Sequence, residues 1–271
     1  MGMTTDKAVS SSSTGTAVRP ALPESWQGWT HIRDCVHCGL CLPSCPTYVT
    51  MGVEMSSPRG RIAMVRALGD GRGTFSTALV RHLDQCLGCL ACEEACPSGV
   101  LYGHALEGAR EAIETHYDRA PADRAVRWLI EHLFPFPHRL GWALSGLYWY
   151  QRLGVSSLVR RSGLLRAVAP RLAQMEALLP SVPASRDRRP LPEHTPAVGT
   201  RRGRIGLLTG CAQRHLLPEL NRATARVLTR AGYDVVAPRE QGCCGALHAH
   251  SGDLEEARRM ARALIETFDG A

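Results

Sequence analysis

Apolar residues recur at helical spacing between positions 58 and 83. One apolar face is formed by Ile62, Val65 and Leu68. A second is formed by Phe75, Leu79 and Leu83. Pro58 can start the first helix and Gly69 can end it, whereas Thr74 is placed to cap the second. We therefore predict two short helices, one from Pro58 to Gly69 and one capped by Thr74.

Residues 103–179 continue the helical pattern with proline breaks. The breaks fall at Pro121, Pro135, Pro137 and Pro170. The centre is rich in aromatic side chains: Trp128, Phe134, Phe136, Trp142, Tyr148, Trp149 and Tyr150. They indicate either a helical core or a docking surface, for a partner or for a membrane beside Arg139 and Arg152. The pattern leaves both interpretations open.

The C-terminal third changes character. Residues 180–203 are rich in Pro and Arg and predict a linker. Short β runs follow at Arg204–Leu208 and Tyr233–Val236, with a helix over Pro218–Arg230 between them. Asp253 and Glu256 form a capping box for a last helix that runs to about Phe268. Strand, helix, strand, helix predicts the start of a parallel α/β layer.

The 271 residues suit two domains, with 44% hydrophobic residues and a formal net charge of +7. Arginine is spread along the chain rather than massed, so we expect no nucleic-acid partner. The N-terminus lacks the apolar core of a signal peptide, and no apolar run approaches membrane-spanning length, which predicts a cytoplasmic protein. We predict an α+β chain with this organisation: disordered tail 1–25, cysteine-rich helical domain 26–102, helical segment 103–179, linker 180–203 and partial α/β module 204–271.

Two cysteine runs have the same spacing. Four cysteines, spaced C-x2-C-x2-C-x3-C and followed by proline, recur 51 residues later in the chain. The first run is Cys35, Cys38, Cys41 and Cys45, and the second is Cys86, Cys89, Cys92 and Cys96. This spacing is typical of proteins with two [4Fe-4S] clusters, in which the fourth cysteine binds the neighbouring cluster. We assign Cys35, Cys38, Cys41 and Cys96 to one cluster, and Cys86, Cys89, Cys92 and Cys45 to the other.

Zinc and disulfides are the alternatives. Paired C-x-x-C hooks also build zinc sites, but zinc does not explain the third cysteine or the proline. Disulfides fit poorly in a chain without an export signal. Trp26, Trp29 and Ile32 are expected to cover one side of a cluster, and His37 to be a polar neighbour rather than a ligand. Gly39 and Gly88 are expected where the loops fold closely round a cluster.

The motifs together resemble the iron-sulfur subunit of bacterial glycolate oxidase, also called glycolate dehydrogenase. The resemblance rests on the cysteine runs, on Pro58-Arg59-Gly60-Arg61, on Gly210-Cys211-Ala212-Gln213 and on Gly242-Cys243-Cys244-Gly245. It covers nearly the whole chain from about residue 30. The family's Cys-Cys-Gly module continues with a further cysteine segment that would fall past Ala271, so we expect a truncated member. Cys211, Cys243 and Cys244 are candidates for an additional metal or cluster site.

The resemblance implies an electron-transfer subunit with two [4Fe-4S] clusters. It implies partner subunits that carry FAD and oxidise glycolate, and a membrane acceptor such as quinone, so that the chain could lie at the inner face of the cytoplasmic membrane. The chain itself shows no Gly-rich dinucleotide motif and no acid-base constellation, so we expect no substrate-oxidising site on it. The alternatives are a related lactate or glycerol 3-phosphate dehydrogenase subunit, a heterodisulfide-reductase-like protein using Cys243 and Cys244, and a zinc-dependent nucleic-acid binder.

Overall fold

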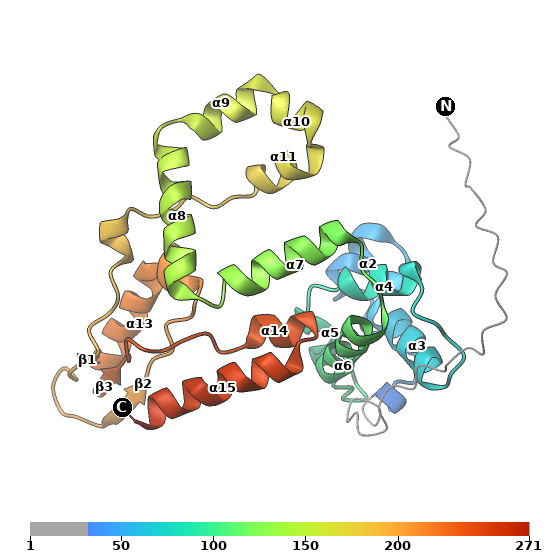
Figure 1. The fold of residues 1–271 in the computed structure, drawn as a ribbon. Coiled ribbons are helices and arrows are strands. Elements are labelled where there is room, and N and C mark those ends of the chain that lie inside the picture. Colours follow the sequence, from blue (N-terminus) through green and yellow to red (C-terminus); the bar gives the residue numbers. More distant parts are fainter. Residues whose placement is uncertain (1–31, 271) are drawn as a thin grey trace. The chain divides into compact units, whose positions relative to one another are not determined.

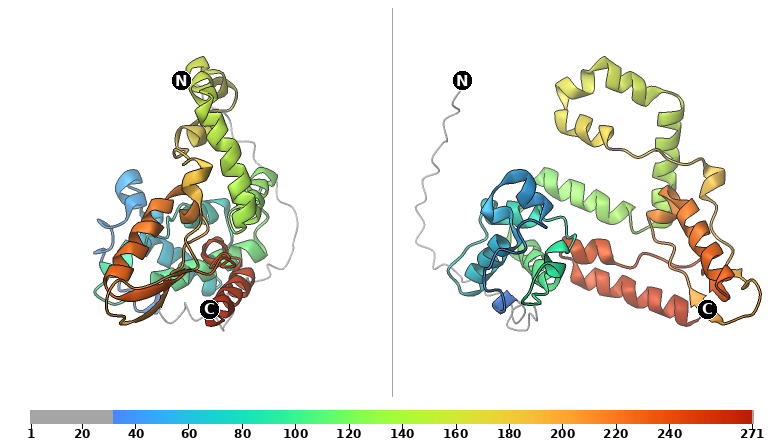
Figure 2. Two further views of the ribbon diagram at one scale, coloured as in Figure 1. Left: turned by 90° about the vertical axis from the view of Figure 1, so that its left-hand side faces the viewer. Right: turned by 180° about the vertical axis from the view of Figure 1, so that it is seen from behind.

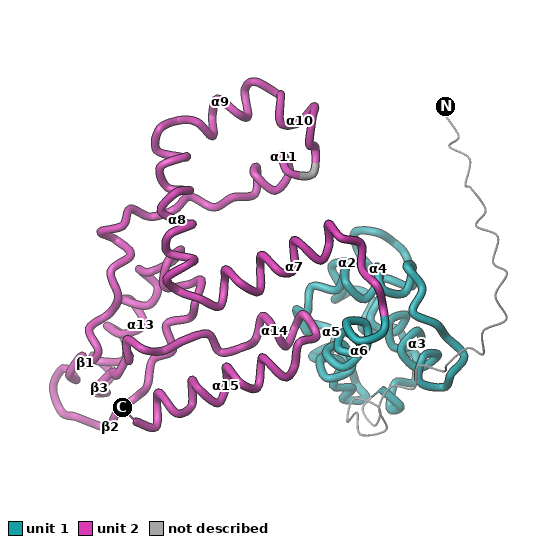
Figure 3. The backbone as a smooth tube through the Cα atoms, viewed as in Figure 1, with its two compact units in different colours: residues 1–116 teal, residues 117–271 magenta. Residues whose placement is uncertain are grey.

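The computed structural model describes residues 32–270, apart from the side chain of Arg171. The predictions for the tail, Trp26 and Trp29 lie outside these residues. The chain divides into two compact units, residues 1–116 and residues 117–271 (Figure 3). Each is described here by itself. The α+β class is confirmed, because helices dominate and one small sheet is present (Figure 1).

The first unit is built from short helices. They are α2 (Pro46–Met51), the 3-10 turn η1 (Glu54–Ser56), α3 (Pro58–Gly69), α4 (Thr77–Asp84), α5 (Ala91–Glu94) and α6 (Tyr102–His116). The predicted helix from Pro58 to Gly69 is confirmed: Ser57 caps it by accepting from the Gly60 N–H at 3.0 Å. The predicted Thr74 cap is wrong. Ser76 caps α4 instead, because its hydroxyl accepts from the Leu79 N–H, and Phe75 lies before the helix.

The core of this unit lies between α3, α4 and α6. Ile62, Val65 and Leu68 of α3 are buried, as their spacing predicts, and so are Leu79 and Leu83 of α4. Helix α6 packs against both helices and buries Ala105, Leu106, Ala109, Ala112 and Ile113. The compact unit therefore extends past residue 102 to His116.

The second unit begins with a series of helices, several of which start at a proline. They are α7 (Pro121–Leu133), α8 (Pro137–Arg152), α9 (Val155–Ser162), α10 (Leu164–Val168) and α11 (Pro170–Ala177). Proline is favourable at the first helical position because its missing N–H would be unpaired there in any case. Helices α9 to α11 form an open ring at the end of α8 (Figure 2, yellow-green to yellow).

The aromatic residues of this segment divide between core and surface. Leu140 and Leu144 of α8 and Val182 form a small buried cluster, against which Phe134 and Tyr148 pack. Trp128, Trp142 and Trp149 are exposed, Trp142 to 82%. The core interpretation thus holds for part of the segment, whereas the docking surface stays a prediction for the exposed tryptophans.

A three-stranded sheet begins the C-terminal part. Its strands are β1 (His194–Thr195), β2 (Gly203–Gly206) and β3 (Tyr233–Val236), in the order β1-β3-β2. Strands β2 and β3 are parallel, which confirms the predicted layer, and Ile205 lies opposite Val235. The prediction that residues 180–203 form only a linker is wrong. They contain the turn η2 (Ser185–Arg188), and β1 pairs antiparallel with β3.

Four helices complete the unit: α12 (Gln213–Leu216), α13 (Pro218–Arg230), α14 (Ala246–Ser251) and α15 (Leu254–Asp269). The predicted bounds of α13 are confirmed, as is the Asp253 cap of α15, which accepts from the Glu256 N–H at 3.2 Å. Helices α12 and α14 are too short to leave a periodic signal. None of the helices among residues 32–270 combines the length and apolar character needed to cross a membrane.

Candidate cluster-binding site

Two adjoining cavities in the first unit are lined by the cysteine runs. The first is lined by Cys35, Cys38, Cys41 and Cys96. The second is lined by Cys86, Cys89, Cys92 and Cys45. Cys92 and Tyr102 lie against both cavities. Each cavity thus receives three cysteines from one run and the last cysteine of the other, and the first cavity is lined by Cys92 as well. All eleven cysteines of the chain are free, so no disulfide joins them.

The two cysteine loops repeat one backbone conformation. Positive φ angles occur at His37 (57°) and Gly39 (87°) in the first run, and at the equivalent Gly88 (63°) and Leu90 (57°) in the second. Such angles turn the chain sharply and favour glycine. A Cβ at Gly39 would lie 2.7 Å from Arg59 Nη1, whereas a Cβ at Gly88 would meet nothing within 4 Å, and the expected close approach of these glycines to a cluster stays a prediction.

Two arginines of α3 hold the first loop. Arg59 donates to the carbonyl of His37 at 3.1 Å and pairs with Glu54. Arg66 donates to the carbonyls of Ile32 and Cys35 and lies 3.1 Å from His37 Nε2. His37 is therefore engaged by arginines from both its carbonyl and its ring, which agrees with its expected place as a polar neighbour.

Arg61 is the largest of the fully buried side chains among the described residues, with 1% of its surface exposed. It donates to the carbonyl of His82 at 2.7 Å and to Thr47 Oγ1 at 3.0 Å, and it approaches Cys45 Sγ at 3.9 Å. Burial by itself would raise the pKa of the Cys45 thiol. Hydrogen bonds from Thr47 and from the Tyr48 amide, together with the Arg61 charge, instead lower that pKa.

Helix α6 supplies the corresponding groups to the second loop. Arg110 donates to the carbonyls of Leu83 and Cys86, at 3.1 and 2.7 Å. The Tyr102 hydroxyl donates to Cys86 Sγ at 3.5 Å. Burial, and then the neighbouring Cys86, raise the pKa of Tyr102, so this hydroxyl stays a donor. In the sequence, Arg61 stood out only as part of a family motif, and no pattern indicated Tyr102 or Arg110. Each of the three reaches the loops from a helix whose periodicity shows only its apolar face.

The donor set fits two four-iron clusters. Each cavity offers at least four thiols, and the pKa values of these thiols differ. Burial raises the pKa of Cys92 to about 12, with a further contribution from Cys86, and burial also raises that of Cys41. Buried thiols of this kind lose their protons when positively charged iron binds them, so binding is coupled to proton release.

The Cys-Cys-Gly segment forms a separate group in the second unit. Cys211 follows β2 and Cys243 follows β3, so parallel strands bring the two thiols together. A hydrogen bond from Cys243, assisted by backbone N–H groups and Arg214, lowers the pKa of Cys211 to about 6. Cys243 is buried and accepts from the Gly245 N–H, whereas Cys244 is exposed. Across residues 32–270, no three His, Cys, Asp or Glu side chains converge on a single metal-ion position.

Comparisons with known families define the class of the chain. Residues 31–100 match a 4Fe-4S dicluster domain and residues 205–271 match a cysteine-rich domain. Residues 122–179 match the linker region of the glycolate oxidase iron-sulfur subunit. The chain is thus an iron-sulfur protein in which a dicluster domain, a helical linker and a cysteine-rich domain follow one another.

Individual relatives narrow this class. The chain is 43% identical over 240 residues to the probable glycolate oxidase iron-sulfur subunit of Bacillus subtilis, and 36% identical over 239 residues to the glycolate oxidase iron-sulfur subunit of Escherichia coli. Each match covers 88% of this chain and about half of the relative, 54% and 52%. Over 67 residues, 25% of the chain, it is 37% identical to lactate utilization protein A of an Exiguobacterium species. No solved structure matches. The resemblance to glycolate oxidase iron-sulfur subunits is confirmed, and the chain is a relative of these proteins.

Proposed function

We propose that the chain is the electron-transfer subunit of an FAD-linked glycolate dehydrogenase complex. In this proposal Cys35, Cys38, Cys41 and Cys96 bind one [4Fe-4S] cluster, and Cys86, Cys89, Cys92 and Cys45 bind the second. The observation that carries the proposal is the pair of adjoining cavities, each lined by cysteines from both runs. The identity to glycolate oxidase subunits supports the choice of complex.

The protein's own residues orient the thiols and set their charge. When bound, the clusters would supply one-electron transfer. Arg66 and Arg110 fix the carbonyls at the start of the two runs, and Arg61 places a positive charge beside Cys45. Four thiolates round each cluster carry net negative charge, and guanidinium groups that donate hydrogen bonds to the loops offset it. FAD and the substrate-oxidising site lie on partner subunits in this scheme.

The proposed acceptor is a membrane quinone, with the chain lying against the inner face of the cytoplasmic membrane. Exposed apolar side chains on α9 to α11, among them Leu158 and Leu164, stand beside Arg160, Arg161 and Arg166. Apolar side chains bordered by arginine are typical of a surface that binds anionic lipid.

A lactate dehydrogenase complex is the second candidate, supported by the partial identity to lactate utilization protein A. Reconstitution decides between the two. Anaerobically purified chain is combined with flavoprotein subunits encoded beside it, and dye reduction is followed with glycolate and with lactate. Glycolate-dependent reduction supports the proposal, and reduction with lactate alone favours the second candidate.

Cluster content is tested directly on the anaerobically purified chain. We expect about eight irons and eight acid-labile sulfides per chain, and a spin-coupled electron paramagnetic resonance spectrum after reduction. Cys35→Ser should lose about half of the iron, whereas Cys244→Ser, at an exposed cysteine outside both cavities, should retain all eight. Zinc without sulfide would contradict the cluster assignment. If the wild-type chain held more than eight irons and Cys244→Ser lost the excess, the Cys-Cys-Gly segment would also bind metal.

A further inference from the structure

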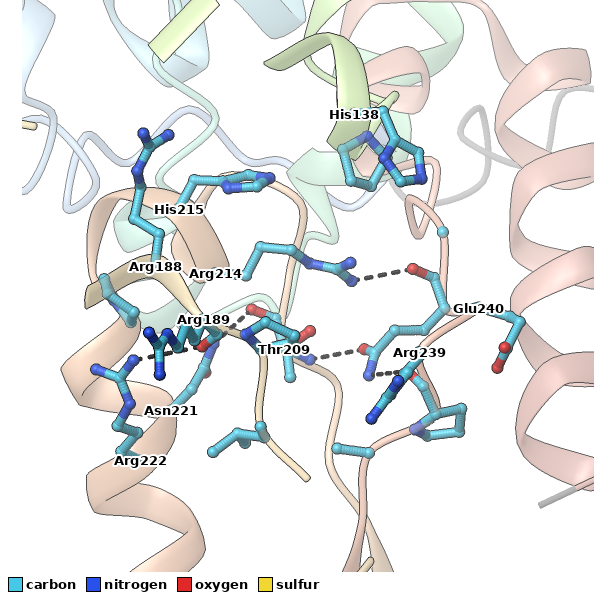
Figure 4. Close-up of a pocket in the computed structure, with 18 residues that line it drawn as sticks. His138, Arg188, Arg189, Thr209, Arg214, His215, Asn221, Arg222, Arg239 and Glu240 are labelled. Carbon is cyan, nitrogen blue, oxygen red and sulfur yellow. Dashed lines mark hydrogen bonds between the residues drawn. The ribbon is translucent and has the colours of Figure 1, made fainter. Parts of the chain in front are cut away.

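A basic cavity of about 430 Å³ lies in the second unit, outside both cysteine-lined cavities (Figure 4). It is bordered by the first residues of α8, by the segment after η2, by the start of α13 and by the loop after β3. Its ionisable lining comprises five arginines, two histidines and one glutamate, Glu240, which is exposed. The volume falls in the usual range for small-molecule sites.

Arg239 of this cavity lies 3.8 Å from Glu193 Oε1, whereas Arg214 and Arg222 bond only to backbone carbonyls within the described residues. Arg214 donates to the carbonyls of Gly210 and Gln241, at 3.1 and 3.0 Å. Arg222 donates to the carbonyls of Asp187 and Arg189. Among the described residues, neither guanidinium has a carboxylate within ion-pair distance. Arg214 is half-buried, and this burial lowers its pKa, with an opposing contribution from Cys211. A half-buried guanidinium is stabilised by an anion that accepts hydrogen bonds from its remaining N–H groups.

Two helix N-termini add to the positive potential. Pro137 is the first residue of α8 and Pro218 is the first residue of α13, and both line the cavity. Neither helix has a side-chain cap, and the first turn of α8 has no acidic residue. Helix N-termini carry partial positive charge and unpaired N–H groups, which favour anions. His138, in the first turn of α8, and Arg239, from the loop after β3, also border the cavity (Figure 4).

We propose that this cavity binds a small organic anion with at least two oxyanion groups, either a phosphate ester or a polycarboxylate. More than one oxyanion group is needed because the basic groups come from separate segments on different sides of the cavity. Guanidinium groups bind phosphate and carboxylate oxygens in the same bidentate geometry, so the two sources share one recognition chemistry. The site uses none of the eight cysteines assigned to clusters.

The test is isothermal titration calorimetry on the full chain with its clusters, using pyrophosphate, citrate and acetate. Pyrophosphate or citrate should bind at least about tenfold more tightly than acetate, because a single carboxylate reaches fewer of the donors. Binding of pyrophosphate alone identifies phosphate as the ligand group, and binding of citrate alone identifies carboxylate. Absence of binding for both, or acetate binding equal to theirs, would overturn the proposal.

Two variants and a matched control locate the binding. Arg222→Gln and Arg239→Gln should each lower the affinity for the polyanion by about tenfold, as expected for loss of one charge-assisted hydrogen bond. Arg186→Gln changes an arginine of η2 that does not line the cavity and should leave binding unchanged. Arg239 is exposed, so its variant keeps the test valid if Arg222→Gln fails to fold. Equal weakening in the Arg186 variant would show that only general surface charge attracts the anion, and the site would be rejected.

Discussion

The four residues Pro58, Arg59, Gly60 and Arg61 show how much a short motif can determine. Pro58 starts α3, and Arg59 holds the first cysteine loop. Gly60 lets α3 approach η1 so closely that a Cβ would lie 2.0 Å from the Glu54 carbonyl oxygen. Arg61 then reaches Cys45 from the same turn of helix. Each residue is needed for a different physical reason, and all four serve the two cavities.

Arg61→Met should weaken cluster retention. The substitution leaves the His82 carbonyl and Thr47 without their donor and removes a buried positive charge beside Cys45. Substitution of residues that support metal ligands in this way typically lowers metal affinity by about 10–100-fold. We therefore expect the rate of cluster loss to a chelator to rise by about that factor. The reduction potential of the cluster bound by Cys45 should also fall, because less positive charge stabilises the added electron.

Visible absorbance under chelator challenge measures the rate of loss, and a redox titration measures the potential. Arg72→Gln, at an exposed arginine paired with Asp70, is the control and should leave both unchanged. An unaltered rate of cluster loss in Arg61→Met would mean that cluster binding by Cys45 does not depend on the charge of Arg61.

Gly60→Ala should destabilise the first unit, whereas Gly146→Ala should not. A Cβ at Gly60 meets backbone that cannot move without shifting η1, and overpacking of this kind costs about 1–3 kcal/mol. Gly146 lies inside α8, where a Cβ would meet nothing within 4 Å, so alanine there should stabilise by about 0.5–1 kcal/mol. Urea unfolding followed by circular dichroism compares the two, and shifts of the same sign would contradict the packing argument.

At the scale of elements, β1 pairs with β3, and one carboxylate of β3 also binds the segment after β1. Asp234 of β3 accepts from the Ala197 N–H at 2.9 Å and from Arg201 Nε at 2.6 Å. The Ala197 hydrogen bond, followed by that from Arg201, lowers the pKa of Asp234 below its usual 3.8. The predicted linker is thereby joined to the α/β layer along most of its second half.

Asp234→Asn should lower stability in a pH-dependent way. The pKa of Asp234 is lower in the folded than in the unfolded chain, so ionised Asp234 stabilises the fold at every pH above the unfolded value. That stability is lost as the pH falls below about 4 and through the folded pKa. The difference in the free energy of unfolding between wild type and variant should be largest at pH 7 and should disappear in acid. Urea unfolding across this range measures it, and a difference that stayed constant with pH would contradict the linkage.

At the scale of the whole molecule, the charge of +7 is not simply a surface property. In the first unit, Arg59, Arg61, Arg66 and Arg110 bond to the cysteine loops. In the second unit, arginines gather at the basic cavity and on the ring of α9 to α11. Some of the arginines that look evenly spread along the sequence thus come together in the structure.

The ring of α9 to α11 should bind anionic membranes. Leu158 and Leu164 are 68% and 67% exposed and lie beside Arg160, Arg161 and Arg166. Sedimentation with phosphatidylglycerol vesicles should recover the full chain, and neutral vesicles should recover much less. Leu158→Asp with Leu164→Asp should reduce binding by about tenfold or more, because charge at the lipid contact opposes insertion. Val227→Asp, on the exposed face of α13, is the matched control. Equal binding by both variants would place the membrane contact elsewhere.

Local rules account for what the sequence predicted. Proline and glycine set helix ends, apolar spacing identified α3 and α13, and the strand-helix-strand order indicated the parallel pair β2 and β3. Cysteine spacing led to the crossed assignment. Three cysteines spaced two residues apart can bind one cluster, and the fourth cysteine then binds the neighbouring cluster. The cap of α4 was missed by two residues, since Thr74 and Ser76 are equally good caps by type and only the chain path selects Ser76.

What the sequence by itself determined is therefore the order of the longer elements, the repeated cysteine pattern and the family that the chain resembles. Only the tertiary structure decided which arginines reach which cysteine loop, that β1 leaves the linker to pair with β3, and that arginines from four segments meet at one cavity. The physical reason is sequence distance. Arg61 bonds to His82 and Arg110 to Cys86, and contacts between residues more than twenty positions apart depend on how helices pack, which no local pattern records.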